Sequence, residues 1–509
     1  MSVKRFSLAA AMLTVAALAS SCAVGPDFNV PAPPSDDRYT REPLRARTAA
    51  ADSPFGAVQH FVPGRDIPGR WWTFFGSRQL DALVEEALTA NSNLQSTLAS
   101  LRAANETVLA QQGKFFPTVQ GNFTPSRQLT SQSISPVLAS GDNPFKLYTA
   151  QLLVSYTFDV WGLNRRTVES QQALADVQRF QAEAAYLTLT SNVVVAAIQE
   201  ASLRGQIDAT NELIAISTRV LKLLNDQFSH GYINRSDVAA QEAALAQIKA
   251  TLPPLRRQLA VQRDLLTALL GRTPSHEPAE TFRLAGLRLP HNIPLSVPSK
   301  LVEQRPDVRA AEEQLHSTSA LVGVAIANML PNVTLSANGG YTATQLAELF
   351  SPMNKFWTLT GSATQTLFDG FTLLHQERAA EATYQQAAWA YRTIVIAAFQ
   401  NVADALHALQ NDADALRAAR DFERAAKVSR DLAQEQFTAG NINFIVLLSA
   451  QQTYQQARIA LVQAQANRLS DTAALFQALG GGWWNRDELV EQKLDVATMR
   501  AEPREDKRE

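Results

Sequence analysis

Cysteine, charge and long apolar runs are all scarce in this chain, and each scarcity excludes a class of structure. Cys22 is the only cysteine among the 509 residues, so an intramolecular disulfide is excluded. No internal apolar stretch reaches the ~20 residues that a transmembrane helix needs. The seven histidines are scattered, and none has the spacing or the cysteine partners of a zinc site. We therefore expect no metal, no cofactor and no internal helical membrane span.

Charged residues make up 18% of the chain, below the ~25% that is usual in soluble domains. The formal net charge is −2, so no overall basic field predicts binding to nucleic acid. Polarity comes instead from Gln, Asn, Ser and Thr, which suits long helices that pack on other helices or face water. If this chain crosses a membrane, it must do so with strands, because no internal helix qualifies.

The N-terminus has the features of an export signal. Lys4 and Arg5 precede an apolar run, 6–18, which is followed by small residues and then Cys22. This pattern predicts a lipoprotein signal peptide, with Cys22 as the lipidated N-terminus of the mature protein. Acyl chains, at ~0.8 kcal/mol per buried CH2, would hold the protein on a membrane. The alternative is an incidental cysteine inside an ordinary signal.

A long unit occurs twice, about 210 residues apart. The clearest match is Gln227-Phe228-x-x-Gly231-x-Ile233-Asn234, which recurs as Gln436-Phe437-x-x-Gly440-x-Ile442-Asn443. Other matches keep the same order, including Phe158-Asp159 with Phe368-Asp369 and Leu270-Gly271 with Leu479-Gly480. Solenoid repeats are much shorter, so the pattern predicts a duplicated, pseudo-symmetric architecture.

Four segments alternate between apolar and polar residues, which predicts strands. They are 118–124, 148–158, 332–342 and 357–367. Most have about 10 residues or slightly more, the length that crosses a bilayer when the strand is tilted. A soluble sheet with one buried face is the alternative, although two separated pairs of strands form a poor layer.

Two long helical segments follow the strand pairs. The segments 165–228 and 378–437 carry apolar residues at steps of three and four. Such stripes are typical of any helical bundle core, but two adjacent stripes predict a helix packed between two neighbours. Each half therefore predicts a helix, two strands, a long helix, a turn and a helix. In the first half, the first helix is expected from Leu80 toward Lys114 and the last from Ser236 to Leu270. The expected domains are a signal peptide (1–21), a lipid-anchored tether (22–70), a first repeat (71–271), a linker (272–300), a second repeat (301–482) and a C-terminal segment and tail (483–509).

Three motifs resemble those of one known family. Cys22-Ala-Val-Gly25-Pro26-Asp27-Phe28 resembles the start of mature NodT-branch lipoproteins in the TolC-like outer membrane efflux family. Arg305-Pro306-Asp307-Val308 is similar to that family's mid-chain signature, and Ala478-Leu479-Gly480-Gly481-Gly482-Trp483 to its C-terminal one. The resemblance implies an α+β membrane protein, a homotrimer. Its subunits share a 12-strand outer-membrane β-barrel that continues as a periplasmic α-helical barrel.

The same resemblance implies a function and partners. The trimer would be a passive exit duct for drugs or other small toxic molecules. A periplasmic adaptor and an inner-membrane transporter of the resistance-nodulation-division (RND) type would deliver them. The protein would lie in outer-membrane lipid, anchored through Cys22, and extend into the periplasm. A duct for type I protein secretion or heavy-metal export is the first alternative, and a coiled-coil scaffold without a channel is the second. No residue pattern predicts an enzyme.

The resemblance also places a gate at the second repeated turn. It implies that Phe437, Gly440, Asn441, Ile442, Asn443, Phe444, Leu448 and Ser449 constrict the duct. Related channels often carry an acidic residue where Ser449 stands, so we expect Leu448 and Phe444 side chains to form the constriction, with hydrogen bonds from Asn441 or Asn443. The alternative is that these residues only pack the turn. In the first repeat, Gly231, Asn234 and Asp237 would face the adaptor.

The remaining motifs predict structural roles. Asp159 and Asp369 stand where a strand becomes a helix, so helix capping is expected rather than catalysis. Arg305-Pro306-Asp307 suits a helix start, because proline fits the first turn and aspartate the positive end of the helix. The glycines 480–482 lack the Lys-Ser/Thr of a phosphate loop.

Overall fold

The structure is a computed structural model that describes residues 23–36, 38–43, 45–131 and 143–486. The predicted signal peptide, Cys22 and most of the C-terminal tail lie outside the described residues. The chain divides into two compact units. Among the described residues, unit 1 contains 23–31, 102–131, 143–177 and 311–391, and unit 2 contains those of 32–101, 178–310 and 392–486.

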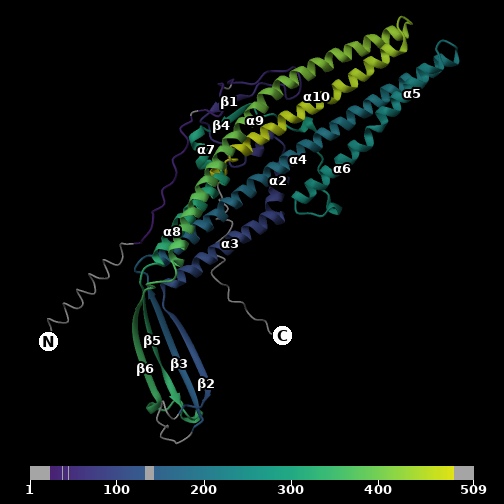
Figure 1. The fold of residues 1–509 in the computed structure, drawn as a ribbon. Coiled ribbons are helices and arrows are strands. Elements are labelled where there is room, and N and C mark those ends of the chain that lie inside the picture. The colour runs from purple at the N-terminus through teal and green to yellow at the C-terminus, as the bar shows by residue number, and fades with distance from the viewer. Residues whose placement is uncertain (1–22, 37, 44, 132–142, 487–509) are drawn as a thin grey trace. The chain divides into compact units, whose positions relative to one another are not determined.

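Unit 1 contains one four-stranded antiparallel sheet (Figure 1). Its strands are β2 (Thr118–Gln128), β3 (Phe145–Phe158), β5 (Asn332–Ala343) and β6 (Lys355–Thr364), and their order is β2-β3-β5-β6. The pairing of β3 with β5 joins the two repeats, with Tyr156 opposite Leu335. The four strands predicted from the alternation are confirmed, and each repeat supplies one hairpin. The outer edges of β2 and β6 pair with no other described strand.

The apolar residues of the sheet are exposed to an unusual degree. Val119 is 65% exposed, Leu152 59% and Trp357 75%. Side chains of this size are normally covered in a soluble protein, so an exposed apolar sheet face indicates contact with another apolar surface. This is the face that the alternation predicted.

Aspartates begin the long helices that follow the strands. The carboxylate of Asp159 accepts hydrogen bonds from the backbone N–H groups of Asn164 (2.8 Å) and Arg165 (3.0 Å). The carboxylate of Asp369 accepts from Thr372 (3.0 Å) and Leu373 (2.9 Å) in the same way. Both satisfy donors that a helix N-terminus leaves free, so the capping role predicted for these residues is confirmed.

The N-terminal motif is packed within unit 1. Val24 donates its N–H to the Trp161 carbonyl (3.0 Å), and the Arg166 guanidinium binds the Val24 carbonyl and the Asp27 carboxylate (3.1 and 2.7 Å). Phe28 stacks on the His316 ring, with 4.4 Å between the ring centroids. The start of the predicted tether is therefore extended but held in place by side chains of the first and second repeats.

The two long helices have the same length. They are α4 (Leu163–Ser229) and α9 (Thr372–Thr438), each of 67 residues. The other α-helices are α2 (Arg78–Ala90), α3 (Ser92–Gln112), α5 (Arg235–Ala250), α6 (Leu252–Leu269), α7 (Pro298–Gln304), α8 (Pro306–Ala327) and α10 (Phe444–Ala478). Short 3-10 turns cover Trp71–Phe75, Gly113–Phe115, Pro274–His276, Leu284–Gly286, Leu346–Glu348, Pro352–Asn354 and Trp483–Asn485.

Two helices expected to be continuous are interrupted. The helix predicted from Ser236 to Leu270 breaks at Thr251, because Pro253 and Pro254 fit only the first turn of a new helix. The helix predicted from Leu80 breaks at Asn91, whose side chain accepts from the Leu94 N–H (3.1 Å) and so begins α3.

The mid-chain and C-terminal motifs bind each other in unit 2. Arg305 donates to the Asp307 carboxylate and to the Ala478 carbonyl (3.0 Å). The Trp483 indole donates to the Gln304 carbonyl (2.7 Å). A Cβ on Gly482 would lie 2.4 Å from the Ile67 carbonyl oxygen, so only glycine fits there. The helix start predicted for Arg305-Pro306-Asp307 is confirmed, because α8 begins at Pro306.

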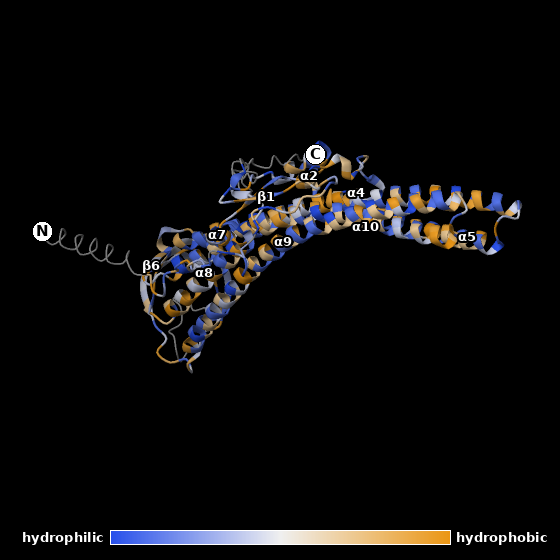
Figure 2. Cartoon of the chain, turned by 90° about the horizontal axis from the view of Figure 1, so that it is seen from above, coloured by the Kyte–Doolittle hydropathy of each residue, from blue (hydrophilic) through white to orange (hydrophobic). Residues whose placement is uncertain are grey.

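A small parallel sheet completes unit 2. It pairs β1 (His60–Pro63) with β4 (Asn292–Leu295). Apolar and polar residues alternate around the helices α4, α9 and α10 (Figure 2). Among the described residues, no helix combines the length and the hydrophobicity of a membrane span.

Candidate functional site

The two repeated turns have the same backbone structure. The N–H of Gly231 binds the Phe228 carbonyl (2.9 Å), and the N–H of Tyr232 binds the Gln227 carbonyl (3.0 Å). Gly440 and Asn441 make the same pair of bonds to Phe437 and Gln436, at 3.0 and 2.9 Å. Both glycines have positive φ angles, 77° and 74°. Each repeat therefore ends its long helix in a Schellman motif, which explains why the glycine recurs.

A shared apolar core lies between the two hairpins. Phe437 and Phe444 meet edge to face, with 5.9 Å between their ring centroids. The cluster combines residues of α4, α5, α9 and α10: Val220, Leu224, Val238, Ala433, Phe437, Phe444, Leu447 and Ala450. Phe444 is 2% exposed and Phe437 6%. Their side chains pack the two hairpins together. In a single chain they lie in the core and do not reach the surface.

The other residues predicted for the gate lie nearer the surface. Gly440, Asn441, Asn443 and Ser449 are exposed, and Ile442 and Leu448 are half-buried against the core cluster. The Asn443 side chain caps α10 by accepting from the Val446 N–H (3.3 Å). The Asn443 side chain therefore already accepts a hydrogen bond within its own helix, whereas Asn441 is exposed to solvent.

Two apolar residues at the second turn were not predicted. Ile445 is 66% exposed and Val446 48% exposed in the first turn of α10. On α9, Val428 and Leu432 are also exposed, at 53% and 52%. The run Phe444-Ile445-Val446-Leu447-Leu448 carried the signal, because a helix with apolar residues on every side must face apolar surroundings on more than one side.

The residues predicted to face an adaptor are accessible at the first turn. Gly231 and Asn234 are exposed and Asp237 is half-buried. Beside them, Tyr232 is 78% exposed and stacks on the His230 ring, with 6.0 Å between the centroids. The surface of this turn is polar and aromatic.

A groove lies below the turns, between α4 and α9. Its volume is 380 Å³. The residues that line it are Ile216, Arg219, Val220, Leu223, Arg430, Asp431 and Gln434. Arg430 also lies over the Tyr454 ring, 4.2 Å from its centroid. The groove has an apolar floor with charged residues at its sides, an arrangement that suits docking of an amphipathic helix.

Farther along α9 and α10, the second repeat contains a buried charged cluster. Arg468 is fully buried and donates to Thr48 and to the Ala57 carbonyl, both at 2.8 Å. Asp412 faces Asp471, and burial together with that second carboxylate raises the pKa of Asp412 to about 7. Burial lowers the pKa of Arg468, and Asp412 opposes that change. Asp412 therefore titrates near neutral pH.

In unit 1, a cavity of 540 Å³ lies where the strands meet the helices. The strand residues that line it are mostly polar and belong to the polar faces predicted from the alternation: Thr118, Ser155, Thr157, Asn332 and Thr364. Such a surface suits contact with water. Among the described residues, no three of His, Cys, Asp and Glu gather as a metal site.

Comparison with known proteins identifies similar chains. The family described as "Outer membrane efflux protein" matches residues 83–272 and 297–481, one segment for each repeat. The pyoverdine export outer membrane protein OpmQ of Pseudomonas putida is 30% identical over 441 residues, covering 86% of this chain and 92% of that protein. The toluene efflux pump outer membrane protein TtgC of Pseudomonas putida is 25% identical. The match covers 96% of this chain and 98% of that protein.

A solved structure shares the fold. The CmeC outer membrane channel of Campylobacter jejuni has a TM-score of 0.81 at 21% identity, over 93% of this chain and 98% of that one. The α+β fold built from two repeats is confirmed, as are the efflux role and the outer-membrane location predicted from the sequence.

Proposed function

The chain belongs to the outer membrane efflux protein family, and from this premise we propose that it forms the exit duct of a tripartite efflux system. The duct is passive and carries small organic molecules delivered by an RND transporter of the inner membrane through a periplasmic adaptor. The observation that carries this proposal is that the two repeats pair into one sheet with exposed apolar residues. In each repeat, the chain continues after its two strands into a 67-residue helix. The export named for the relatives, of pyoverdine and of toluene, suggests the class of cargo.

The duct requires three copies. Four strands from one chain leave open edges at β2 and β6, and open edges in lipid leave backbone groups unsatisfied. Three copies close a barrel of 12 strands, with Val119, Leu152 and Trp357 toward lipid and the polar faces toward the lumen.

Crosslinking in cells tests the partners. The tagged protein is extracted from membranes after crosslinking, and the captured proteins are identified by mass spectrometry. Recovery of an adaptor together with an RND transporter is the expected result. Recovery of an ATP-binding transporter would favour type I secretion, and a heavy-metal transporter would favour metal export. Recovery of a monomer without either class of partner would favour the scaffold without a channel.

The second turn forms the periplasmic gate of the duct. Asn441, Ile442, Leu448 and Ser449 surround the exposed residues Ile445 and Val446, and three copies bring these surfaces together. Gly440 and Asn443 set the backbone of the turn, and Phe437 and Phe444 hold it from the core. Leu448→Ala is expected to raise single-channel conductance in a planar bilayer. Unchanged conductance would contradict this assignment.

The first turn and the groove below it receive the adaptor. Gly231, Asn234 and Asp237 form the tip, and Arg219 and Arg430 line the groove. Replacing Arg219 or Arg430 with glutamate is expected to abolish adaptor crosslinking and leave conductance unchanged. Loss of conductance in these variants would place the groove in the gate instead.

Cys22 anchors the mature chain in the membrane. The next residue, Ala23, packs on Gly162, and Val24 binds Trp161, so the first described residues of the chain lie next to the start of α4. Radiolabelled palmitate is expected to label the wild-type protein but not the Cys22→Ser variant. Equal labelling of both would overturn the lipid anchor.

A further inference from the structure

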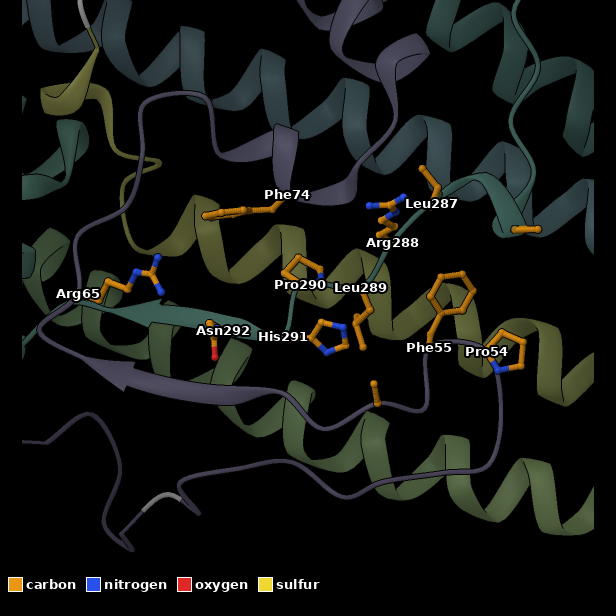
Figure 3. Close-up of a pocket in the computed structure, with 12 residues that line it drawn as sticks. Pro54, Phe55, Arg65, Phe74, Leu287, Arg288, Leu289, Pro290, His291 and Asn292 are labelled. Atoms are coloured by element: carbon orange, nitrogen blue, oxygen red, sulfur yellow. The ribbon is translucent and has the colours of Figure 1, made fainter.

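A second groove lies on unit 2, on residues that the proposed gate and adaptor site do not use. Its volume is 770 Å³ (Figure 3). Arg65, Arg288 and His291 provide its basic groups, and Phe55, Phe74 and Leu289 provide apolar walls. None of its twelve lining residues is acidic. The groove is therefore basic in a protein whose net charge is slightly negative.

The two arginines have no counter-charge within the described part of the chain. Both side chains are exposed, and neither guanidinium pairs with a described carboxylate. Arg263 of the same unit, by contrast, pairs with the Glu200 carboxylate (2.8 Å). Figure 3 shows Arg65 at one end of the lining residues, well apart from Arg288. Two separated cations favour a ligand with two separated negative groups.

A backbone hydrogen bond and close packing hold the walls of the groove in place. The backbone N–H of Arg288 donates to the Phe75 carbonyl (2.8 Å), and its Cδ lies where a Cβ on Gly76 would come within 2.8 Å. Gly76 therefore leaves room for the Arg288 stem.

Phe55 forms another wall in a strained conformation. Its φ is 62°, a left-handed value that bulky residues rarely adopt. A tight turn holds it there, because Gly56 donates to Ser53 and Ala51 donates to Gly56, both at 2.8 Å. Strain of this kind persists only where the surrounding structure enforces it, and it is concentrated at binding sites.

We propose that this groove binds an extended acidic peptide segment of a partner protein. Two carboxylates of the peptide pair with Arg65 and Arg288, and an apolar side chain between them contacts Phe74 and Leu289. A small inorganic anion would engage only one guanidinium and leave the apolar walls uncovered. A carboxylated glycan would satisfy the arginines but lacks an aliphatic side chain for those walls. This proposal goes beyond the efflux role and does not depend on it.

Fluorescence anisotropy of the full-length protein in detergent tests the proposal. The probe is a short labelled peptide in which glutamate alternates with leucine, and the control peptide has glutamine in place of glutamate. Binding of the glutamate peptide is expected, with at least tenfold weaker binding in Arg65→Gln/Arg288→Gln. The matched control is Arg78→Gln/Arg283→Gln, which removes two exposed arginines outside the groove and is expected to change affinity less than twofold.

Salt and competing ligands complete the test. Raising NaCl from about 50 to about 500 mM is expected to weaken binding several-fold, because the arginines are exposed and readily screened. Equal binding of the glutamine peptide, or equal affinity in both double variants, would overturn the proposal. Binding of an oligogalacturonate in place of the peptide would overturn it too, since the occupant would then be a glycan.

Discussion

The two repeated turns share a backbone but differ in their surface. Alignment of Gly231 with Gly440 pairs Arg235, Ser236 and Asp237 of the first turn with Phe444, Ile445 and Val446 of the second. The polar set is solvent-accessible, whereas the apolar set divides between the shared core and the exposed surface. Duplication preserved the Schellman motif, and the residues after it diverged. We interpret the first turn as facing an external partner and the second as facing copies of itself.

The same alignment separates the helices that follow. Asp412, Arg468 and Asp471 of the second repeat occupy the positions of Leu203, Leu259 and Gln262 in the first. These three charged residues are therefore specific to the second repeat, since the aligned positions of the first repeat are uncharged. They lie on α9 and α10, the two helices that carry the proposed gate.

The largest expected effect comes from the aligned pair Phe444 and Arg235. Phe444→Ala is expected to lower the free energy of unfolding by about 3–5 kcal/mol, because the ring is 2% exposed and fills the shared core. Arg235→Ala should change it by less than ~0.5 kcal/mol, since the pair of Arg235 with Glu242 is exposed. Thermal unfolding followed by tryptophan fluorescence measures both. Equal losses of Tm would contradict the difference between the turns.

The half-buried carboxyl group of Asp412 should make stability depend on pH. The pKa of Asp412 is about 7 in the folded chain and 3.8 in the unfolded chain, so between those values the folded state retains a proton that the unfolded state loses. The free energy of unfolding therefore falls as pH rises from about 4 to about 7. Since Asp412 is partly exposed, we expect a fall on the order of 1–2 kcal/mol.

Asp412→Asn isolates this contribution. The variant is expected to flatten the dependence of Tm on pH between about 4 and 8, because the amide cannot ionise. Asp404→Asn is the matched control on the exposed side of α9 and should retain the wild-type slope. A wild-type slope in Asp412→Asn would show that another group titrates.

Glycine substitutions test whether the backbones of the turns are equivalent. Gly231→Ala and Gly440→Ala should each cost about 1 kcal/mol, because both residues have positive φ and a Cβ would meet no other atom within 4 Å. The two falls in Tm should therefore match. A much larger fall for one glycine would mean that tertiary contacts, rather than the Schellman motif, determine that turn.

The smallest effect concerns the asparagines that begin the returning helices. Asn443 accepts a hydrogen bond from the Val446 N–H, whereas the Asn234 side chain makes no capping bond. Asn443→Ala should cost about 1 kcal/mol, and Asn234→Ala only a few tenths. The two Tm values measured side by side check this. A larger fall in Tm for Asn234→Ala than for Asn443→Ala would mean that the capping side chain is in the first repeat.

Local patterns in the sequence predicted most of the fold. Alternation located all four strands, and the aspartates at 159 and 369 marked the starts of the long helices. The breaks at Asn91 and Thr251 were missed, although Pro253 and Pro254 carried the signal for the second. The apolar stripes alone did not locate these ends, because an apolar stripe continues across a short interruption.

Placement in three dimensions was harder to predict. Phe444 was expected in the gate, but its side chain lies in a core formed by four helices, and neighbouring Ile445 and Val446 are the exposed residues. An apolar run in a helix does not reveal which side of the helix packs against the same chain and which side stays exposed. The burial of Arg468 by Thr48 and Ala57 was also invisible in sequence, because more than 400 positions separate these partners.

Single-channel conductance of exchanged turns tests the central claim most directly. Ile445→Ser/Val446→Asp gives the second turn the residues of the first, and Ser236→Ile/Asp237→Val makes the reverse exchange. We predict that the first variant raises conductance in a planar bilayer at least twofold, because charged residues in three copies repel and hydrate the constriction. The reverse exchange should leave conductance unchanged. Unchanged conductance in the first variant, or an equal rise in both, would contradict a gate at the second turn.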